Sequence, residues 1–128
     1  MAPSSVTTVG TGAFTSCPIK NMTAPLNVIS SVSPDTLNKI HIIGDTDIPI
    51  RAFQERTALK SVTIGGQIGV IEYRAFYNCT NLEEVIIEQG VEEIKNSVFN
   101  SCSSLKSITI PGSVKTIGDY AFYECTQL

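Results

Sequence analysis

The sequence repeats with a period of 23 residues, and this feature constrains the fold more than any other. Three residue types recur at that step. The recurring residues are Leu59, Leu82, Leu105 and Leu128; Phe53, Phe76, Phe99 and Phe122; and Cys79, Cys102 and Cys125. A period of this length predicts a solenoid, in which each unit forms one coil of the chain and stacks on the next.

Four consecutive units account for most of the chain, which we interpret as one domain over 1–128. The units are 37–58, 59–81, 82–104 and 105–127. The first unit is one residue short and carries Arg56 where the other three carry cysteine. The array therefore predicts about four complete coils.

The N-terminal segment contains part of the same pattern. "VTTVGTGAFTSC" at 6–17 matches "VKTIGDYAFYEC" at 114–125 at six of twelve positions. We interpret 6–17 as a partial repeat that starts the Phe and Cys columns. The Pro-, Ser-, Asn- and Thr-containing segment 18–36 predicts an irregular insertion, with a strand at Leu26–Ile29. An N-terminal cap, a binding loop and a degenerate extra repeat all remain open for this segment.

Each unit divides into a strand, a corner and a turn. In the last unit, Ile108 and Ile110 alternate at period two, which indicates a short strand. Pro111-Gly112 marks a corner, and a second apolar pair follows at Val114 and Ile117. The "AF" dipeptide and the cysteine then predict a single helical or 3₁₀ turn. Coils stacked about 4.8 Å apart would bring like residues into ladders.

Composition excludes several classes of partner. A formal net charge of −3 gives no electrostatic case for nucleic acid or for an anionic membrane. No apolar run approaches the roughly 20 residues of a membrane-spanning helix. The N-terminus shows no basic segment followed by a hydrophobic one. We therefore expect neither a nucleic-acid partner nor membrane insertion in this segment.

The repeat motif "LxxIxIPxSVxxIGxxAFxxC", best seen at 105–125, resembles the BspA-like, Treponema-type class of leucine-rich repeats. The resemblance covers Leu37 to Leu128, with 6–17 as a partial unit. Arg56 and Val98 depart from the motif, at the Cys and Ala positions. The resemblance implies a β-rich, horseshoe-like right-handed solenoid with strands on its concave face and short helical or 3₁₀ turns. It also implies a protein-binding or adhesive role at a cell surface or after secretion.

The four cysteines allow three interpretations. Cys17 corresponds to the column of Cys79, Cys102 and Cys125. Stacked coils would place neighbouring Cys backbones about 5 Å apart, within reach of a disulfide. In-register side chains point the same way, however, which suits a disulfide torsion poorly, and a reduced thiol is a good small buried group. A metal site is the third alternative, but no CxxC pair is present and we expect no metal.

No set of residues supports catalysis. His41 is the single histidine, at an outward strand position, and no Ser, Cys or Asp has a repeat position beside it. "GTG" at 10–12 falls within a repeat turn and is not a phosphate-binding loop. The glutamates of 82–104 fall on different faces of the coil. We therefore expect no enzyme activity, no cofactor and no metal.

The remaining candidates are outward residues of the strands and their flanks, which a protein ligand could contact. They are Lys39, His41, Lys60, Thr63, Glu84, Ile86, Glu88, Lys106 and Thr109. Ile86 is the apolar member of its column and lies between Glu84 and Glu88. It is the first residue we would test as an anchor.

Two functions follow. The first is a non-catalytic protein-binding solenoid, a fragment of a surface or secreted adhesion or host-interaction protein; its location rests on the family resemblance alone. The alternative is an assembly module that self-associates through exposed repeat ends, because the ladders stop without a polar cap at Leu128.

Overall fold

The computed structural model describes residues 8–14, 16–32 and 35–128, and its main element is a five-stranded parallel sheet. In sheet order, the strands are β1 (Asn21–Pro25), β2 (Lys39–Ile43), β3 (Ser61–Ile64), β5 (Glu84–Ile87) and β7 (Ser107–Thr109). The second sheet contains β4 (Val70–Ile71), β6 (Glu93–Ile94) and β8 (Thr116–Ile117). The one helix of the described residues is α1 (Leu26–Ile29).

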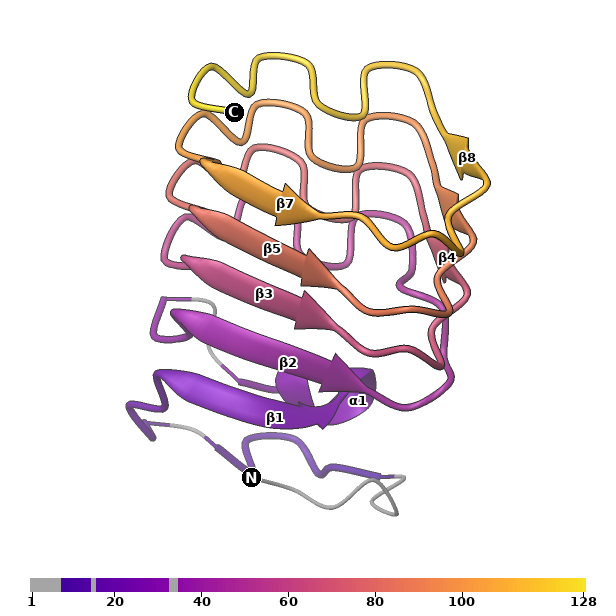
Figure 1. The fold of residues 1–128 in the computed structure, drawn as a ribbon. Helices are drawn as coiled ribbons and strands as arrows, with labels where there is room; N and C mark the ends of the chain where they lie inside the picture. The colour runs from indigo at the N-terminus through magenta and orange to yellow at the C-terminus, as the bar shows by residue number, and fades with distance from the viewer. Residues whose placement is uncertain (1–7, 15, 33–34) are drawn as a thin grey trace.

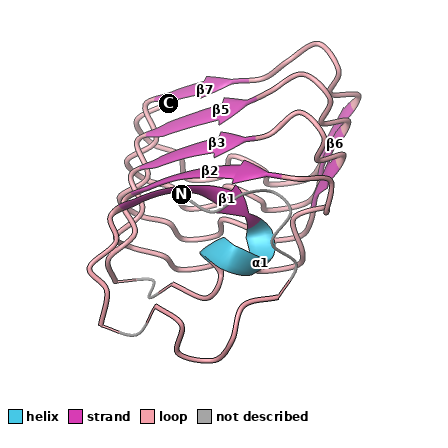
Figure 2. Cartoon of the chain, turned by 90° about the horizontal axis from the view of Figure 1, so that it is seen from below, coloured by secondary structure: helices cyan, strands magenta, loops and turns pink. Residues whose placement is uncertain are grey.

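The chain coils upward from the N-terminus to the C-terminus (Figure 1). Each coil crosses the front along a strand of the large sheet and returns behind, and the last three coils turn at a corner into the small sheet on the way. This path is a right-handed solenoid, as the repeat and its resemblance predict. Seen from below, the strands of the large sheet stack side by side and α1 lies at the N-terminal end (Figure 2).

The coils have nearly constant length except for the first. Register partners are 22 residues apart between β2 and β3, and 23 apart at the next two steps. Between β1 and β2 they are only 18 apart, as the pairing of Asn21 with Lys39 shows. The first coil is therefore too short for a strand of the second sheet, and α1 takes that place.

The prediction for 18–36 was wrong in two respects. A strand lies at Asn21–Pro25, where we expected irregular structure, and Leu26–Ile29 is helical rather than extended. Met22 and Ala24 face the core at period two, and β1 pairs in register with β2. After β1 the chain turns back through α1, and this helical turn buries Val28 and Ile29.

The segment 6–17 falls partly outside the described residues, which exclude 1–7 and 15. In its described part, Val9 and Phe14 are half-buried against the core. Phe14 does not start the Phe column as expected, because the short coil with α1 separates it from Phe53. Cys17 is exposed and free.

Stacked phenylalanines form the centre of the other coils. Phe53, Phe76 and Phe99 are fully buried. Their rings lie 5.2 Å and 5.4 Å apart at interplanar angles of 11° and 10°. Phe122 continues the stack at 5.6 Å, half-buried in the last coil. The predicted Phe ladder thus runs through four coils.

The segment around each Phe is a series of turns closed by hydrogen bonds between residues three apart, as in the 3₁₀ alternative of the expected helical or 3₁₀ turn, but no continuous helix forms. Arg74 and Asn78, two residues on either side of Phe76, have φ of 57° and 58°. Such left-handed residues interrupt a helix. They turn backbone N–H groups toward the next coil, where the N–H of Phe76 donates to the carbonyl oxygen of Val98 at 2.9 Å.

The cysteine column is a ladder of thiol hydrogen bonds. Cys79 Sγ donates to the Phe53 carbonyl oxygen at 3.2 Å, and Cys102 Sγ donates to that of Phe76 at 3.2 Å. All four cysteines are free. Burial raises the pKa of the Cys79 thiol to about 12, which keeps it uncharged and unreactive near neutral pH.

Glycines allow neighbouring coils to touch at the corners. A Cβ on Gly65 would lie 2.7 Å from the carbonyl oxygen of Ile42. A Cβ on Gly90, whose φ is +131°, would overlap the carbonyl oxygen of Gly66. The corner is therefore backbone packed on backbone, and it leaves a notch in the surface.

We expect Phe99→Ala to lower the free energy of unfolding by about 3–5 kcal/mol, because it removes a buried ring stacked on both sides. Phe122→Ala is the control. It should cost clearly less, since Phe122 is half-buried and stacks on one side only. Urea denaturation measures both, and a loss below about 1 kcal/mol for Phe99→Ala would contradict the buried ladder.

Gly90→Ala should destabilise the protein by at least about 2 kcal/mol, because the new methyl group meets backbone and the φ is unfavourable. Gly112→Ala is its matched control at a corner in the next coil, where nothing lies within 4 Å of the added Cβ. That variant should stay within about 0.5 kcal/mol of the parent. Equal melting curves for the two variants would show that the coils do not touch here.

Candidate functional site

The outward side chains of the five-stranded sheet form one surface, which we call the strand face. It contains two rows set by the strand register. The first row is Asn21, Lys39, Ser61, Glu84 and Ser107, and the second is Thr23, His41, Thr63, Ile86 and Thr109. Six of the nine predicted residues lie in these rows.

The other three predicted residues flank the strands. Lys60 and Lys106 lie one residue before β3 and β7, and Glu88 lies one residue after β5. Lys106 Nζ lies 3.4 Å from Glu83 Oε1. The structure thus brings all nine onto the strand face or its edges.

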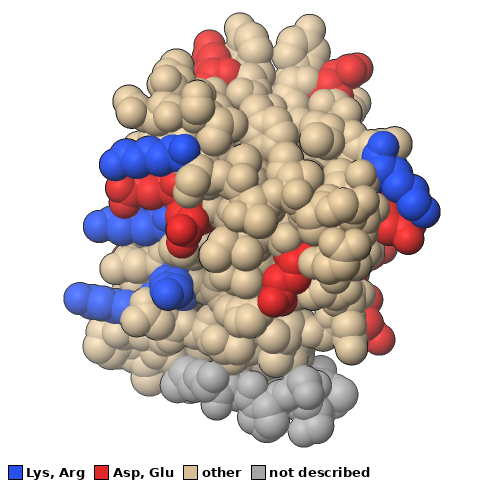
Figure 3. Space-filling model, viewed as in Figure 1, with Lys and Arg blue, Asp and Glu red and all other residues tan. Residues whose placement is uncertain are grey.

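Charge on this side of the molecule gathers mainly at its edges (Figure 3). Lysines and glutamates alternate along the side where the strands begin, and another mixed group lies at the opposite edge. The exposed pairs include Lys106 with Glu83 and Lys115 with Glu92, each at 3.4 Å. Exposed pairs of this kind contribute little to stability. Most of the centre of the face is uncharged, although Figure 3 also shows acidic atoms near its middle.

Ile86 is the only aliphatic residue in its row, and it is half-buried. Its register partners are Thr63 on β3 and Thr109 on β7. Glu84, two residues earlier on β5, accepts a long hydrogen bond from Ser61 Oγ at 3.5 Å. Threonines on the two neighbouring strands, and Glu84 and Glu88 along its own chain, therefore flank one apolar side chain.

His41 and Glu88 meet across β3. His41 Nε2 lies 3.4 Å from Glu88 Oε1, and the side chains are 37% and 47% exposed. They can meet because Gly65, after β3, has no side chain to separate them. No group of three His, Cys, Asp or Glu residues within the described segments could hold a metal ion. The pair offers a polar contact on the surface.

Two adjoining pockets beside the strand face were not predicted from the sequence. One has a volume of about 550 Å³ and is lined by residues that include Leu26, Asp45 and Pro49. The other, of about 360 Å³, includes Gly65 and Glu88. Both pockets are also lined by Ile43 and Gly44. We call the combined depression the shoulder groove.

The sequence carried a partial signal for the groove. Gly44, Gly65 and Gly66 mark corners, and glycine corners leave surface notches. The larger pocket depends on the short first coil, which the composition of 18–36 did not reveal.

Two solved structures resemble the fold. A leucine-rich repeat protein from Bacteroides ovatus matches with a TM-score of 0.59 and 25% identity, over 93% of this chain and 38% of the other. A leucine-rich repeat protein of T. pallidum matches with a TM-score of 0.55 and 22% identity, over 87% of this chain and 57% of the other. The chain thus spans little more than half of one and less than half of the other.

None of the curated proteins compared with the chain matches it. In the described segments, no helix has the length and apolar character needed to cross a membrane. The family model for the BspA type leucine-rich repeat region matches residues 1–45 and 46–128, in six copies. Repeat length, coil architecture and this match agree, and the chain belongs to the BspA-type leucine-rich repeat family.

Proposed function

We propose that this chain is a non-catalytic scaffold that binds a protein partner through the strand face, with Ile86 as the central anchor. The observation that carries the proposal is an apolar side chain in a row of hydroxyl-bearing and imidazole side chains, with Glu84 and Glu88 beside it on the same face. An apolar centre inside a polar rim is the usual anatomy of a protein interface. Leucine-rich repeat solenoids often serve in protein interaction through their extended surfaces.

The same proposal includes a place of action at a cell surface or in the secreted fraction, in adhesion or host interaction. It is supported by the family of the chain and by its structural neighbours, which are bacterial leucine-rich repeat proteins.

The test uses a partner identified by cross-linking to the biotinylated chain, with affinities then measured for purified proteins. We expect Ile86→Glu to weaken binding by at least about tenfold, because it places a charge at the anchor. Ile50→Glu is the matched control, since Ile50 is 57% exposed and lies outside the strand face. Unchanged affinity of the double variant Ile86→Glu/Glu84→Lys for every identified partner would refute the proposal.

A second candidate, self-association through the C-terminal coil, is favoured by one observation. Ile117 is 48% exposed, whereas Ile94, one coil earlier in the same column, is 1% exposed. Leu128, Tyr120 and Tyr123 are also exposed in this coil. An uncovered repeat edge can stack on a second copy of the chain.

Light scattering over a range of concentrations tests this candidate. We expect dimers that Ile117→Lys converts to monomers, with the far-UV circular dichroism unchanged. A monomer at every concentration would rule self-association out and leave the strand-face proposal untouched.

A further inference from the structure

We infer that the shoulder groove receives an extended segment of the protein partner that presents a lysine or arginine side chain. The cationic head would lie by Asp45 or Glu88, and an adjacent apolar residue would contact the walls. The inference rests on the proposed function, in that the occupant belongs to a protein partner. It adds a second contact region and the chemistry that this region selects.

The groove exists because the first coil is short. With 18 residues between register partners, that coil turns back through α1 and never reaches the second sheet. Leu26 therefore forms one wall, while Pro49 and Ala52 of the next coil stay uncovered on the other. In Figure 1, α1 lies just beside the carboxyl ends of β1 and β2.

The groove continues across the ends of β2 and β3. Ile43 and Gly44 line both pockets, so the two pockets adjoin there. Gly65 and Gly66 form part of the lining beyond them, and a side chain at Gly65 would collide with the Ile42 carbonyl oxygen. The apolar walls and backbone floor suit the methylene stem of a lysine or arginine.

The described lining of the groove carries acidic residues but no lysine or arginine. Asp45 and Glu88 carry the carboxylates. Asp45 is exposed and makes no hydrogen bond or ion pair within the described part of the chain. Glu88 pairs with His41, which is charged only when protonated.

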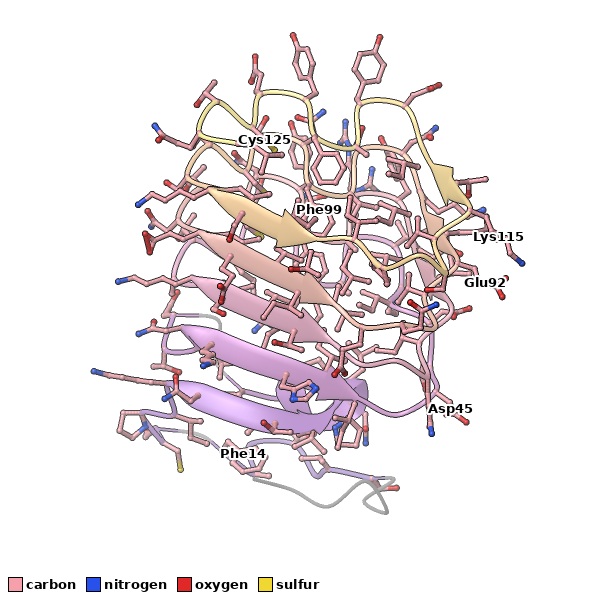
Figure 4. The ribbon with its side chains drawn as sticks, viewed as in Figure 1. Phe14, Asp45, Glu92, Phe99, Lys115 and Cys125 are labelled. Atoms are coloured by element: carbon pink, nitrogen blue, oxygen red, sulfur yellow. The ribbon has the colours of Figure 1, made fainter. Side chains whose placement is uncertain are left out.

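Three acidic residues outside the groove have a lysine beside them. Glu83, Glu92 and Glu93 each pair with a lysine at 3.4 Å or less. In Figure 4, Asp45 points outward from the edge of the solenoid, on the same side as the Glu92–Lys115 pair but nearer the N-terminus. Asp45 and Glu88 of the groove, by contrast with these three, have no lysine or arginine partner among the described residues.

The adjacent sheet edge favours side-chain capture over strand addition. Pro49 has no backbone N–H to donate, and Asp47 Oδ1 already accepts the N–H of Val70 at 3.0 Å. Proline and charged residues at a sheet edge discourage pairing with another strand. A bound segment would therefore be recognised by its side chains.

Nuclear magnetic resonance titration tests the groove without needing the natural partner. The probe is N-acetyl-Leu-Arg-amide, and the control is N-acetyl-Leu-citrulline-amide, which has nearly the same shape without the charge. We expect saturable shifts of the amide signals of Gly44, Gly65 and Gly66 with the arginine peptide. The citrulline peptide should bind about fivefold more weakly.

Variants that remove one carboxylate charge at a time show which carboxylate binds the arginine peptide. Asp45→Asn and Glu88→Gln should each weaken binding of the arginine peptide about threefold, and about tenfold together, without changing the citrulline peptide. Glu92→Gln, an exposed carboxylate outside the groove, should change neither. The amide spectrum of each variant reports directly whether it is folded.

Three results would overturn the inference. They are equal affinity for the two peptides, no loss in the double variant, or no shifts at the groove glycines up to about 10 mM peptide. Ile86→Glu separates this inference from the proposed function, because Ile86 does not line the groove. That variant should leave peptide binding intact even where it abolishes binding of the whole partner.

Discussion

Stacking of one coil on the next through like side chains is the interaction on which the whole structure depends. Phe76 illustrates it, because its ring packs between those of Phe53 and Phe99 and its carbonyl oxygen accepts the thiol of Cys102. Its N–H donates to the following coil. Ring stacking, thiol hydrogen bonds and these backbone hydrogen bonds all join two coils, so a single coil has little stability of its own.

Both candidate binding regions follow from this stacking. Where it is regular, it aligns outward side chains in rows and produces the strand face around Ile86. Where it is interrupted, it produces the shoulder groove, since the first coil returns through α1 and leaves Pro49 uncovered. Regular and irregular coils would then contribute different contacts to one partner, an apolar anchor from the first and a cation site from the second.

Much of the fold could be predicted because the repeat is nearly exact. The period of two within each strand correctly placed Thr63 and Ile86 outward and Val62 and Val85 in the core. The strand at Asn21–Pro25 was missed, because Ala24 and Pro25 are weak strand signals and the coil departs from the common length. Phe14 was misassigned because the first coil is unusually short. The sequence match between 6–17 and 114–125 does not show how many coils lie between Phe14 and the next Phe of the column.

The sequence by itself determined the coil and its ladders, because apolar residues at a 23-residue period can be buried together only if each unit stacks on its neighbour. The tertiary structure decided what the surface offers between the ladders. His41 and Glu88 meet although 47 residues separate them, because Gly65 leaves the space between them open. The shoulder groove likewise depends on where one coil stops short, and that becomes visible only when the coils are stacked.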